Sequence, residues 1–531
     1  MNIKILDCTL RDGGYINEWN FKYHNIKAII NGLTEANVDI VECGFLEDSS
    51  LYDINLSLFS DINQIKHMLP LKRNDTEYVA MTRFGNLNIN NLDICDGTSI
   101  SGLRITFHID EISEAMEFCR QVKDKGYKVF VQPVGTTSYS DEELLSLIKA
   151  VNELNPYSFY IVDTLGIMTK NDVHRMFYLV DNNLIQDITV GFHSHNNLQL
   201  SFSNAQELIS FQTKRTIVID SSVYGMGRGA GNLNTELIAQ HINKEIKETY
   251  RIDKILEIVD EYIANIKSQF DWGYSVPYYL AAIHNCHPNY ASFFINKKTL
   301  QVSLIAKILD MIPAERRELY DEKLVETLYS EFQTRWIDDK ESLKTLSEEL
   351  SYRRVLIIAP GKNSLDFNGK ISQYISDFSP IIISVQFIPD KFTPDFLFFS
   401  NRKRFNHFVA EQNLMYRNYK LITTSNIEQE DQISDYTLNY SSLLNGYSRI
   451  RDNSTLMILQ LLAMMNVDEI VLAGFDGYNV HSKNNYINES METLLSESIL
   501  KEINEQISNY LSNFQDENDL KVTSITPSIF V

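Results

Sequence analysis

Gly191-Phe192-His193-Ser194-His195-Asn196-Asn197 closes one apolar, strand-like run of this chain, and Arg11-Asp12-Gly13 closes another. Side chains alternate along a strand, so His193 and His195, two positions apart, point to the same side of it. Two imidazoles and a carboxylate from a distant strand can hold a divalent metal ion and leave positions open for substrate oxygens. The two motifs therefore predict an enzyme with a metal site formed by Asp12, His193 and His195.

The first 225 residues alternate apolar strand-like runs with amphipathic helical segments. The runs lie at 3–10, 38–45, 78–84, 102–108, 128–134, 158–164, 188–195 and 217–225. Eight such units, each with a strand buried on both faces, are typical of a (β/α)8 barrel. An open doubly wound sheet also uses these units. Here, however, polar residues follow runs one, two, six, seven and eight, as they do at the catalytic face of a barrel. We therefore expect an α/β protein that begins with a TIM barrel.

Two further regions follow the expected barrel. Helical patterns at 253–268, 299–311 and 321–334 predict a helical extension, which ends in the charged segment 337–351. Strand-like runs at 355–359, 380–388, 395–399, 420–424 and 469–473 then predict a Rossmann-like α/β domain. The expected domains are residues 1–250, 251–350 and 351–531.

Composition narrows the class of protein. The chain has 531 residues, with 48 basic against 70 acidic side chains and a net charge of −22. Such a balance gives no electrostatic footprint for nucleic acid or for an anionic membrane. The five cysteines are scattered, as in a reducing compartment. There is no basic leader and no apolar run near the roughly 18 residues of a membrane helix. We expect a soluble, cytoplasmic protein.

A glycine-rich stretch follows the eighth run. Tyr224-Gly225-Met226-Gly227-Arg228-Gly229-Ala230-Gly231-Asn232 has four glycines within seven residues, which allow a sharply folded loop or a close approach of the backbone to a ligand. Asn232 can then offer an amide oxygen to the site. A carboxylate with neutral imidazoles suits Mn²⁺, or alternatively Mg²⁺, better than structural zinc.

Together these residues resemble a known family. Leu6-Asp7-Cys8-Thr9-Leu10-Arg11-Asp12-Gly13-Gly14, the paired histidines and the 225–232 loop are similar to the three signatures of the barrel metallolyases. That family includes hydroxymethylglutaryl-CoA lyase, isopropylmalate synthase and 4-hydroxy-2-oxovalerate aldolase. The likeness is greatest to the last and reaches about residue 310, because Gly273-Tyr274, Asn289-Tyr290 and the helix near 299–309 resemble its tyrosine-bearing helices.

The resemblance implies roles for matching positions. Asp12, His193 and His195 match the family's metal ligands, and Asn232 matches an asparagine that ligates or adjoins the metal in some members.

Substrate positions are implied in the same way. Arg11 matches the arginine that stabilises an enolate oxygen, while Glu42 and Thr164 match supporting and substrate-pocket positions. The aldolases have a histidine, acting as general acid and base, where this chain has Tyr15. A phenol with an ordinary pKa near 10 is a poor base at neutral pH. Proton transfer is therefore assigned to Tyr15 with a metal-bound water, or to Tyr274.

The expected reaction follows from these parts. A 2-oxo acid such as pyruvate chelates the metal, which lowers the cost of forming its enolate, and the enolate adds to an aldehyde or is released by the reverse cleavage. A Claisen condensation with an acyl-CoA, as in the synthase branch, is the alternative within enzymes. A non-catalytic barrel that serves as a scaffold for the second domain is the alternative outside them. The helical extension resembles partner-contacting helices, which favours a homo-oligomer.

The last domain shows a strand followed by a polar turn at 355–365, which can present backbone amides to a phosphate. It is not a Walker loop, because Leu356 stands where a glycine is required, and a purely structural turn is the alternative. Ser400–Arg404 and Gly474–Tyr478 follow two other strands, where open sheets bind ligands. This region faintly resembles sialyltransferase-like domains of bacterial surface-sugar enzymes. We therefore expect it to bind a nucleotide or sugar phosphate, and the aldehyde to be sugar-derived, as in carbohydrate biosynthesis.

Overall fold

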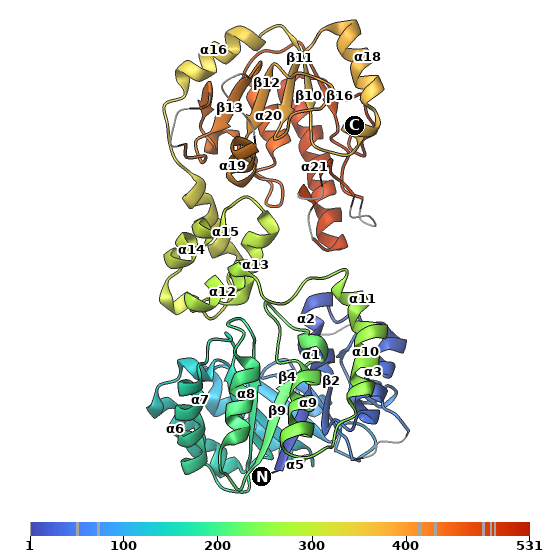
Figure 1. The fold of residues 1–531 in the computed structure, drawn as a ribbon, viewed down its shortest axis with the longest axis vertical. Coiled ribbons are helices and arrows are strands. Elements are labelled where there is room, and N and C mark those ends of the chain that lie inside the picture. The colour runs from blue at the N-terminus through green and yellow to red at the C-terminus, as the bar shows by residue number, and fades with distance from the viewer. Residues whose placement is uncertain are drawn as a thin grey trace. The chain divides into compact units, whose positions relative to one another are not determined.

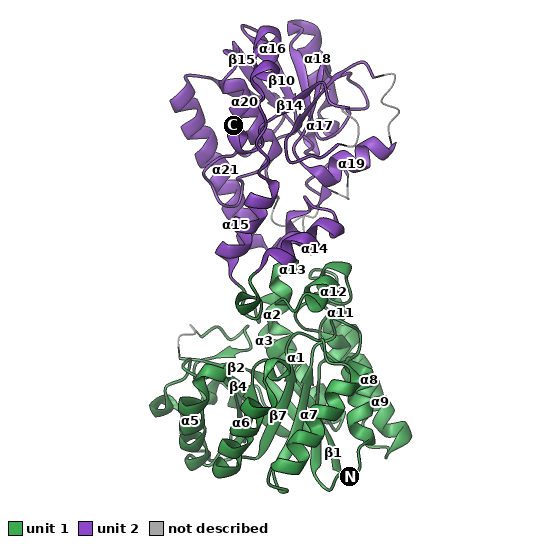
Figure 2. Cartoon of the chain, turned by 90° about the vertical axis from the view of Figure 1, so that its left-hand side faces the viewer, with its two compact units in different colours: residues 1–292, 313–320 green, residues 293–312, 321–531 purple. Residues whose placement is uncertain are grey.

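A computed structural model describes residues 2–48, 52–71, 75–411, 417–429, 433–479, 484–488, 491–492 and 495–531. Contacts within the chain divide it into two compact units (Figure 2). The first contains Met1–Ser292 and Pro313–Tyr320, and the second contains Phe293–Ile312 and Asp321–Val531. No helix among the described residues is both long and apolar enough to cross a membrane.

The first unit is a closed barrel of parallel strands, as the sequence predicts (Figure 1). Its strands are β1 (Asn2–Asp7), β2 (Ile40–Leu46), β4 (Glu77–Arg83), β5 (Gly102–Phe107), β6 (Lys128–Pro133), β7 (Ser158–Asp163), β8 (Thr189–Ser194) and β9 (Thr216–Ser221). Pairing of β1 with β2, Leu6 opposite Ile40, closes the cylinder. A two-residue strand, β3 (Leu58–Phe59), lies beside β2 and was not expected.

Helices surround the strands on the outside of the barrel (Figure 1). The main ones are α3 (Tyr23–Glu35), α5 (Ile112–Asp124), α6 (Asp141–Leu154), α7 (Lys170–Asn183), α8 (Ser201–Ser210) and α9 (Thr235–Glu245). Capping boxes begin two of them, with Ser140 and Glu143 at α6 and Thr169 and Asp172 at α7. Each box satisfies backbone N–H groups that a helix start otherwise leaves without partners.

The inside of the barrel is apolar at its centre and charged toward the ends of the strands. Leu6, Ile40, Val79, Phe130 and Val218 pack together inside it with no exposed surface. Arg104 of β5 is equally buried but is charged, so it needs buried partners. These partners belong to the candidate site.

The helices after the barrel are divided between the two units. They are α10 (Ile252–Ile258), α11 (Ala264–Lys267), α12 (Val276–Ile283), α13 (Pro288–Lys297), α14 (Val302–Met311), α15 (Glu322–Gln333) and α16 (Lys340–Leu350). The segment 251–350, expected as one extension, is therefore shared by both units. Leu346 and Leu350 of α16 lie fully buried in the core of the second unit, so this helix packs with the second sheet. Domain boundaries at residues 250 and 350 stay a prediction.

The second unit contains a parallel sheet in the order β14-β13-β12-β11-β10-β15-β16. Its strands are β10 (Arg354–Ile358), β11 (Ile381–Val385), β12 (Phe396–Phe399), β13 (Lys420–Thr424), β14 (Tyr436–Leu438), β15 (Glu469–Ala473) and β16 (Val522–Ser524). The chain builds outward from β10 to β14 and then returns to place β15 on the other side of β10. Helices between strands include α18 (Asn368–Phe378), α19 (Arg402–Glu411), α20 (Ser454–Ala463) and α21 (Glu497–Asn518).

Candidate metal centre

Asp12, His193 and His195 lie together at one end of the barrel. Asp12 ends the short helix α1 (Thr9–Asp12) after β1, His193 belongs to β8, and His195 follows that strand. All three side chains are buried, and each offers a ligand atom within 4.8 Å of the other two. The two histidine rings stand edge to face with their centroids 5.2 Å apart. One metal ion can therefore be reached by all three.

Asn232 lies against Asp12 in this cluster. Its Nδ2 donates hydrogen bonds to Asp12 Oδ2 at 2.6 Å and to the carbonyl oxygen of Met226 at 3.1 Å. Its Oδ1 is buried and has no hydrogen-bond partner among the residues that the structure describes. An unpartnered buried oxygen beside a carboxylate and two imidazoles fits a divalent cation.

Electrostatics keep the ligands in the forms that a cation requires. Burial opposes ionisation of Asp12, but Arg11, followed by His195 and His193, lowers its pKa well below the usual range. Burial also lowers the pKa of His195 to about 3, although the Asp12 charge acts in the opposite direction. At neutral pH the site therefore offers a carboxylate and a neutral imidazole, both with lone pairs available.

A chain of buried charges supports the ligands from behind. His193 Nδ1 donates to Asp220 Oδ2 at 3.0 Å, which leaves Nε2 of the ring for a cation. Asp220 also pairs with Arg104. The sequence analysis missed both residues. The signal was available, because Arg104 interrupts an apolar run and Asp220 ends another, and a charge in a buried strand requires a partner.

The same chain of charges continues to Asp12. Arg104 Nη1 donates to Glu42 Oε2 at 2.8 Å, and Arg11 Nε donates to the same oxygen at 2.9 Å. Arg11 Nη1 donates in turn to Asp12 Oδ1 at 2.7 Å. Arg11 Nη2 and Glu42 Oε1 are buried without a partner within the described part of the chain. Arg11 therefore has a free donor beside the candidate metal site.

The glycine-rich loop brings its backbone against these ligands. A Cβ atom on Gly227 would lie 2.4 Å from Asn232 Nδ2 and 2.8 Å from Asp12 Oδ2, closer than real contacts allow. Gly231 has a φ of +80°, and a Cβ there would lie 2.0 Å from the carbonyl oxygen of Gly225. Both positions therefore require glycine.

The remaining predicted residues differ in their placement. Thr164 is half-buried, and its hydroxyl accepts a hydrogen bond from the backbone N–H of Gly135 at 2.9 Å. Tyr15 is 38% exposed, and its ring lies 4.2 Å from Arg228 Cζ. Tyr274 is 57% exposed, and none of the contacts described for this chain joins it to the metal ligands. The assignment of proton transfer to Tyr274 therefore has no support from its position.

Comparisons with known proteins find similar sequences and structures for the barrel. Residues 2–261 match the model of the HMGL-like family. A 4-hydroxy-2-oxovalerate aldolase from Geobacillus genomosp. 3 is 29% identical over 268 residues, which cover 50% of this chain and 77% of that protein. An oxaloacetate decarboxylase from Mycobacterium tuberculosis is 25% identical, with 45% of this chain and 70% of that protein covered. The solved HMG-CoA lyase from Brucella melitensis is 15% identical, with a TM-score of 0.41, and 50% of this chain and 99% of that chain are covered.

The family match covers the barrel and ends at residue 261, before the second sheet begins. The strand order, the buried ligand cluster and the family match concern the same segment of the sequence. Residues 2–261 of this chain are therefore similar to the HMGL-like family.

Proposed function

We propose that the barrel is a divalent-metal-dependent aldolase that forms or cleaves a carbon–carbon bond between a pyruvate-type 2-oxo acid and an aldehyde. The observation that carries the proposal is the buried cluster of Asp12, His193 and His195 with the unpartnered oxygen of Asn232. The relatives named as 4-hydroxy-2-oxovalerate aldolases support this kind of chemistry for the barrel.

The four side chains would hold the metal ion, with Mn²⁺ preferred and Mg²⁺ as the second choice. Nitrogen and oxygen ligands in this mixture suit Mn²⁺, while Mg²⁺ favours oxygen alone. When bound, the cation supplies Lewis-acid polarisation of the keto group of the substrate. Asp220 holds the ring of His193 in the tautomer that leaves Nε2 free.

Arg11 has the second role in the proposal. Its Nε and Nη1 are bound by Glu42 and Asp12, which fix the plane of the guanidinium, while Nη2 keeps a free N–H. A fixed donor with a positive charge stabilises negative charge on an oxygen that develops in front of it. The keto oxygen of a 2-oxo acid gains such charge when a proton leaves its methyl group. Arg11 would therefore act at that oxygen.

Exchange of the methyl protons of pyruvate with deuterated water tests the proposal without any knowledge of the aldehyde. Wild-type protein treated with a chelator should show no exchange, and added Mn²⁺ should restore it. Asp12→Asn should abolish exchange, and Arg11→Ala should slow it greatly. Absence of exchange with every divalent metal would favour the non-catalytic scaffold. Exchange followed by consumption of an acyl-CoA in place of an aldehyde would favour the Claisen alternative.

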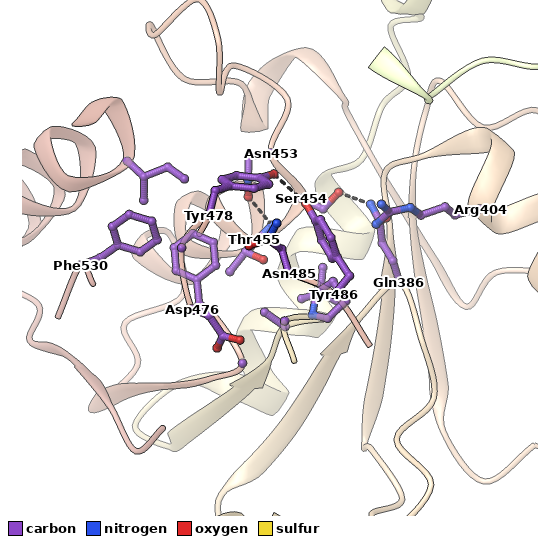
Figure 3. Close-up of a pocket in the computed structure, with 18 residues that line it drawn as sticks. Gln386, Arg404, Asn453, Ser454, Thr455, Asp476, Tyr478, Asn485, Tyr486 and Phe530 are labelled. Carbon is purple, nitrogen blue, oxygen red and sulfur yellow. Dashed lines mark hydrogen bonds between the residues drawn. The ribbon is translucent and has the colours of Figure 1, made fainter. Parts of the chain in front are cut away.

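A binding function of the second unit is favoured by a cavity at one edge of its sheet (Figure 3). The cavity, of about 90 Å³, lies where β10, β11 and β15 end and α20 begins. The order of strands reverses between β10 and β15, and open parallel sheets bind ligands at such a point. Side chains from several segments line it, including Gln386, Arg404, Ser454, Asp476 and Tyr486.

The lining suits a phosphorylated, hydroxyl-bearing ligand. Arg404 Nη1 donates to Gln386 Oε1 at 2.6 Å, so its guanidinium is held at the cavity with a positive charge. Asp476 Oδ2 accepts the backbone N–H of Asn363 at 2.7 Å, while Oδ1 is buried without a partner in the described ranges. The cation fits a phosphate, and the free carboxylate oxygen fits ligand hydroxyls. We infer a nucleotide, nucleotide-sugar or sugar-phosphate ligand, which makes a sugar-derived aldehyde the preferred substrate of the barrel.

Calorimetric titration of the full chain with UDP, CMP, ADP and glucose 6-phosphate tests this second function. Arg404→Gln should weaken binding of whichever compound binds. Arg402→Gln is the matched control, because Arg402 is on the same helix and pairs with Glu428, away from the cavity. Lack of binding by all four compounds would remove this assignment and leave the barrel reaction untouched.

A further inference from the structure

His287 comes from outside the barrel strands and contacts Arg228 of the glycine-rich loop. It lies between α12 and α13, in the first unit. Its Nε2 is 3.4 Å from Arg228 Nη1, and Arg228 Cζ lies 4.2 Å from the centroid of the Tyr15 ring. Burial, the positive charge of Arg228 and the nearby His195 all lower the pKa of this imidazole. Arg228 therefore contacts both His287 and Tyr15, the residue that stands where the aldolases have a histidine.

Hydrogen bonds fix which nitrogen of His287 carries the proton. The side chain is buried, and Nδ1 accepts the backbone N–H of Asn289 at 3.1 Å. The backbone N–H of His287 donates to the carbonyl oxygen of Arg317 at 2.7 Å, which anchors the loop. A neutral imidazole has a single N–H, so that proton must be on Nε2. His287 therefore presents a donor toward Arg228.

The ring stays neutral at physiological pH. Burial, followed by the positive charge of Arg228 and by His195, lowers the pKa of His287 to about 3. A second proton on Nδ1 would also face the N–H of Asn289 and break that hydrogen bond. His287 therefore acts as a hydrogen-bond donor, a role that a neutral imidazole can have in an active site. It is not a proton shuttle.

Two donors thus face each other with no acceptor between them. A guanidinium has only N–H groups to offer, so Nη1 of Arg228 and Nε2 of His287 cannot satisfy each other. Within the described residues, Arg228 forms no ion pair with a carboxylate. An oxygen atom of a ligand placed between the two would accept from both. Besides burial, the positive charge of Arg228 lowers the pKa of the metal ligand His195, so Arg228 lies near that ligand.

On the basis of the proposed aldolase function, we propose that His287 and Arg228 form the subsite for the carbonyl oxygen of the aldehyde, in place of the histidine that position 15 lacks. When the new carbon–carbon bond forms, the π electrons of the aldehyde carbonyl move to this oxygen, which takes up one proton from water. Two preorganised donors, one of them charged, stabilise the oxygen during that change. In the cleavage direction they hold the same oxygen as a hydroxyl. His287 keeps its own proton throughout.

Two reactions of the Mn²⁺-loaded full chain separate this role from the metal chemistry. Exchange of pyruvate methyl protons needs no aldehyde, so His287→Ala should leave its rate within about twofold of wild type. Addition to acetaldehyde, glycolaldehyde or D-glyceraldehyde should fall about 10- to 100-fold, the effect of losing one hydrogen bond to a charged oxygen. His287→Gln keeps an N–H near the position of Nε2 and should recover most of the addition rate.

A spectroscopic measurement needs neither metal nor substrate. In the ¹⁵N spectrum of the metal-free protein with labelled histidines, the ring signals lost in His287→Gln should have the pattern of the Nε2–H tautomer. The Nδ1–H tautomer would overturn the proposal. Equal losses of exchange and addition in His287→Ala would also overturn it, as would loss of neither. Use of none of the three aldehydes by wild type would overturn the subsite, whereas failure of wild-type exchange would remove the aldolase function itself.

Discussion

Replacement of Asp220 by asparagine measures how strongly the buried charges control metal binding. Asp220 Oδ2 accepts from His193 Nδ1 at 3.0 Å and also pairs with Arg104. Asparagine keeps the size of the side chain but loses the charge and one acceptor oxygen. Outer partners of metal-binding histidines change metal affinity by about 10- to 100-fold, which corresponds to about 1.4–2.7 kcal/mol. We expect Asp220→Asn to weaken Mn²⁺ binding by this amount.

The same substitution should lower stability without metal. Arg104 is fully buried and would keep only Glu42 as a charged partner. A hydrogen bond between charged groups contributes about 1.5–3 kcal/mol, so the loss should be about 2 kcal/mol and lower the melting temperature of the metal-free protein. The variant therefore has two independent readouts.

Calorimetric titration of chelator-treated protein with Mn²⁺ gives the affinity, and thermal unfolding gives the stability. Asp181→Asn is the matched control, because Asp181 also pairs with a buried arginine, Arg215, at 2.5 Å. Arg215 directly precedes β9, whereas Asp220 lies near the other end of that strand. The control should lose stability but keep its Mn²⁺ affinity. If Asp220→Asn binds Mn²⁺ within about twofold of wild type, Asp220 supports only the fold, and the reasoning is refuted.

Three further outcomes are expected. Gly227→Ala should abolish Mn²⁺ binding, because its Cβ would lie 2.8 Å from Asp12 Oδ2, whereas Gly369→Ala, with open space around its Cβ, should bind normally; equal affinities of the two variants would contradict this. Burial raises the pKa of Asp7 to about 6, so the protonated form stabilises the fold. That contribution is complete below pH ~4 and is lost as the pH rises through about 6. The melting temperature of wild type relative to Asp7→Asn should therefore fall from pH 4 to 7, and a constant difference would show the reasoning to be wrong. Dialysis against a chelator should lower the melting temperature of wild type and leave that of Asp12→Asn unchanged, since only wild type has a bound cation to lose; equal shifts would argue against the site.

The barrel could be predicted from the sequence because its strands are buried on both faces and read as continuous apolar runs. All eight expected strands of the barrel are present, with ends that differ by a few residues. Short edge strands give no such signal: β14 and β16 have three residues each and were missed. The helix α16 was expected at the end of the extension, because most of its residues are charged or polar. Its two leucines that pack in the second core therefore gave little signal in the sequence.

The candidate site was only partly predictable for a related reason. Residues that follow strands of a barrel meet at one rim, so Asp12 and the two histidines could be expected to lie together. The pairing of Arg104 with Asp220 depends on which strands face each other across the barrel interior. The spacing of residues in the sequence does not show which strands these are. His287 arrives from a helical segment whose path over the barrel has no periodic signature. Tyr274 was chosen from a motif alone, and its exposure does not support the choice.

The alternating charges behind the candidate ligands also bear on which ion and acid the proposed reaction would use. Asp12, Glu42 and Asp220 with Arg11 and Arg104 carry a net charge of −1, and all five are buried. A divalent ion reverses the sign of this enclosed set, and one carboxylate of an incoming acid then makes it electrically neutral. With a monovalent ion the net charge of the set is already zero before the acid binds. With a divalent ion and a dianion the net charge becomes negative again. Because these side chains are buried, the proposed function would favour a divalent ion and a monocarboxylate bound together.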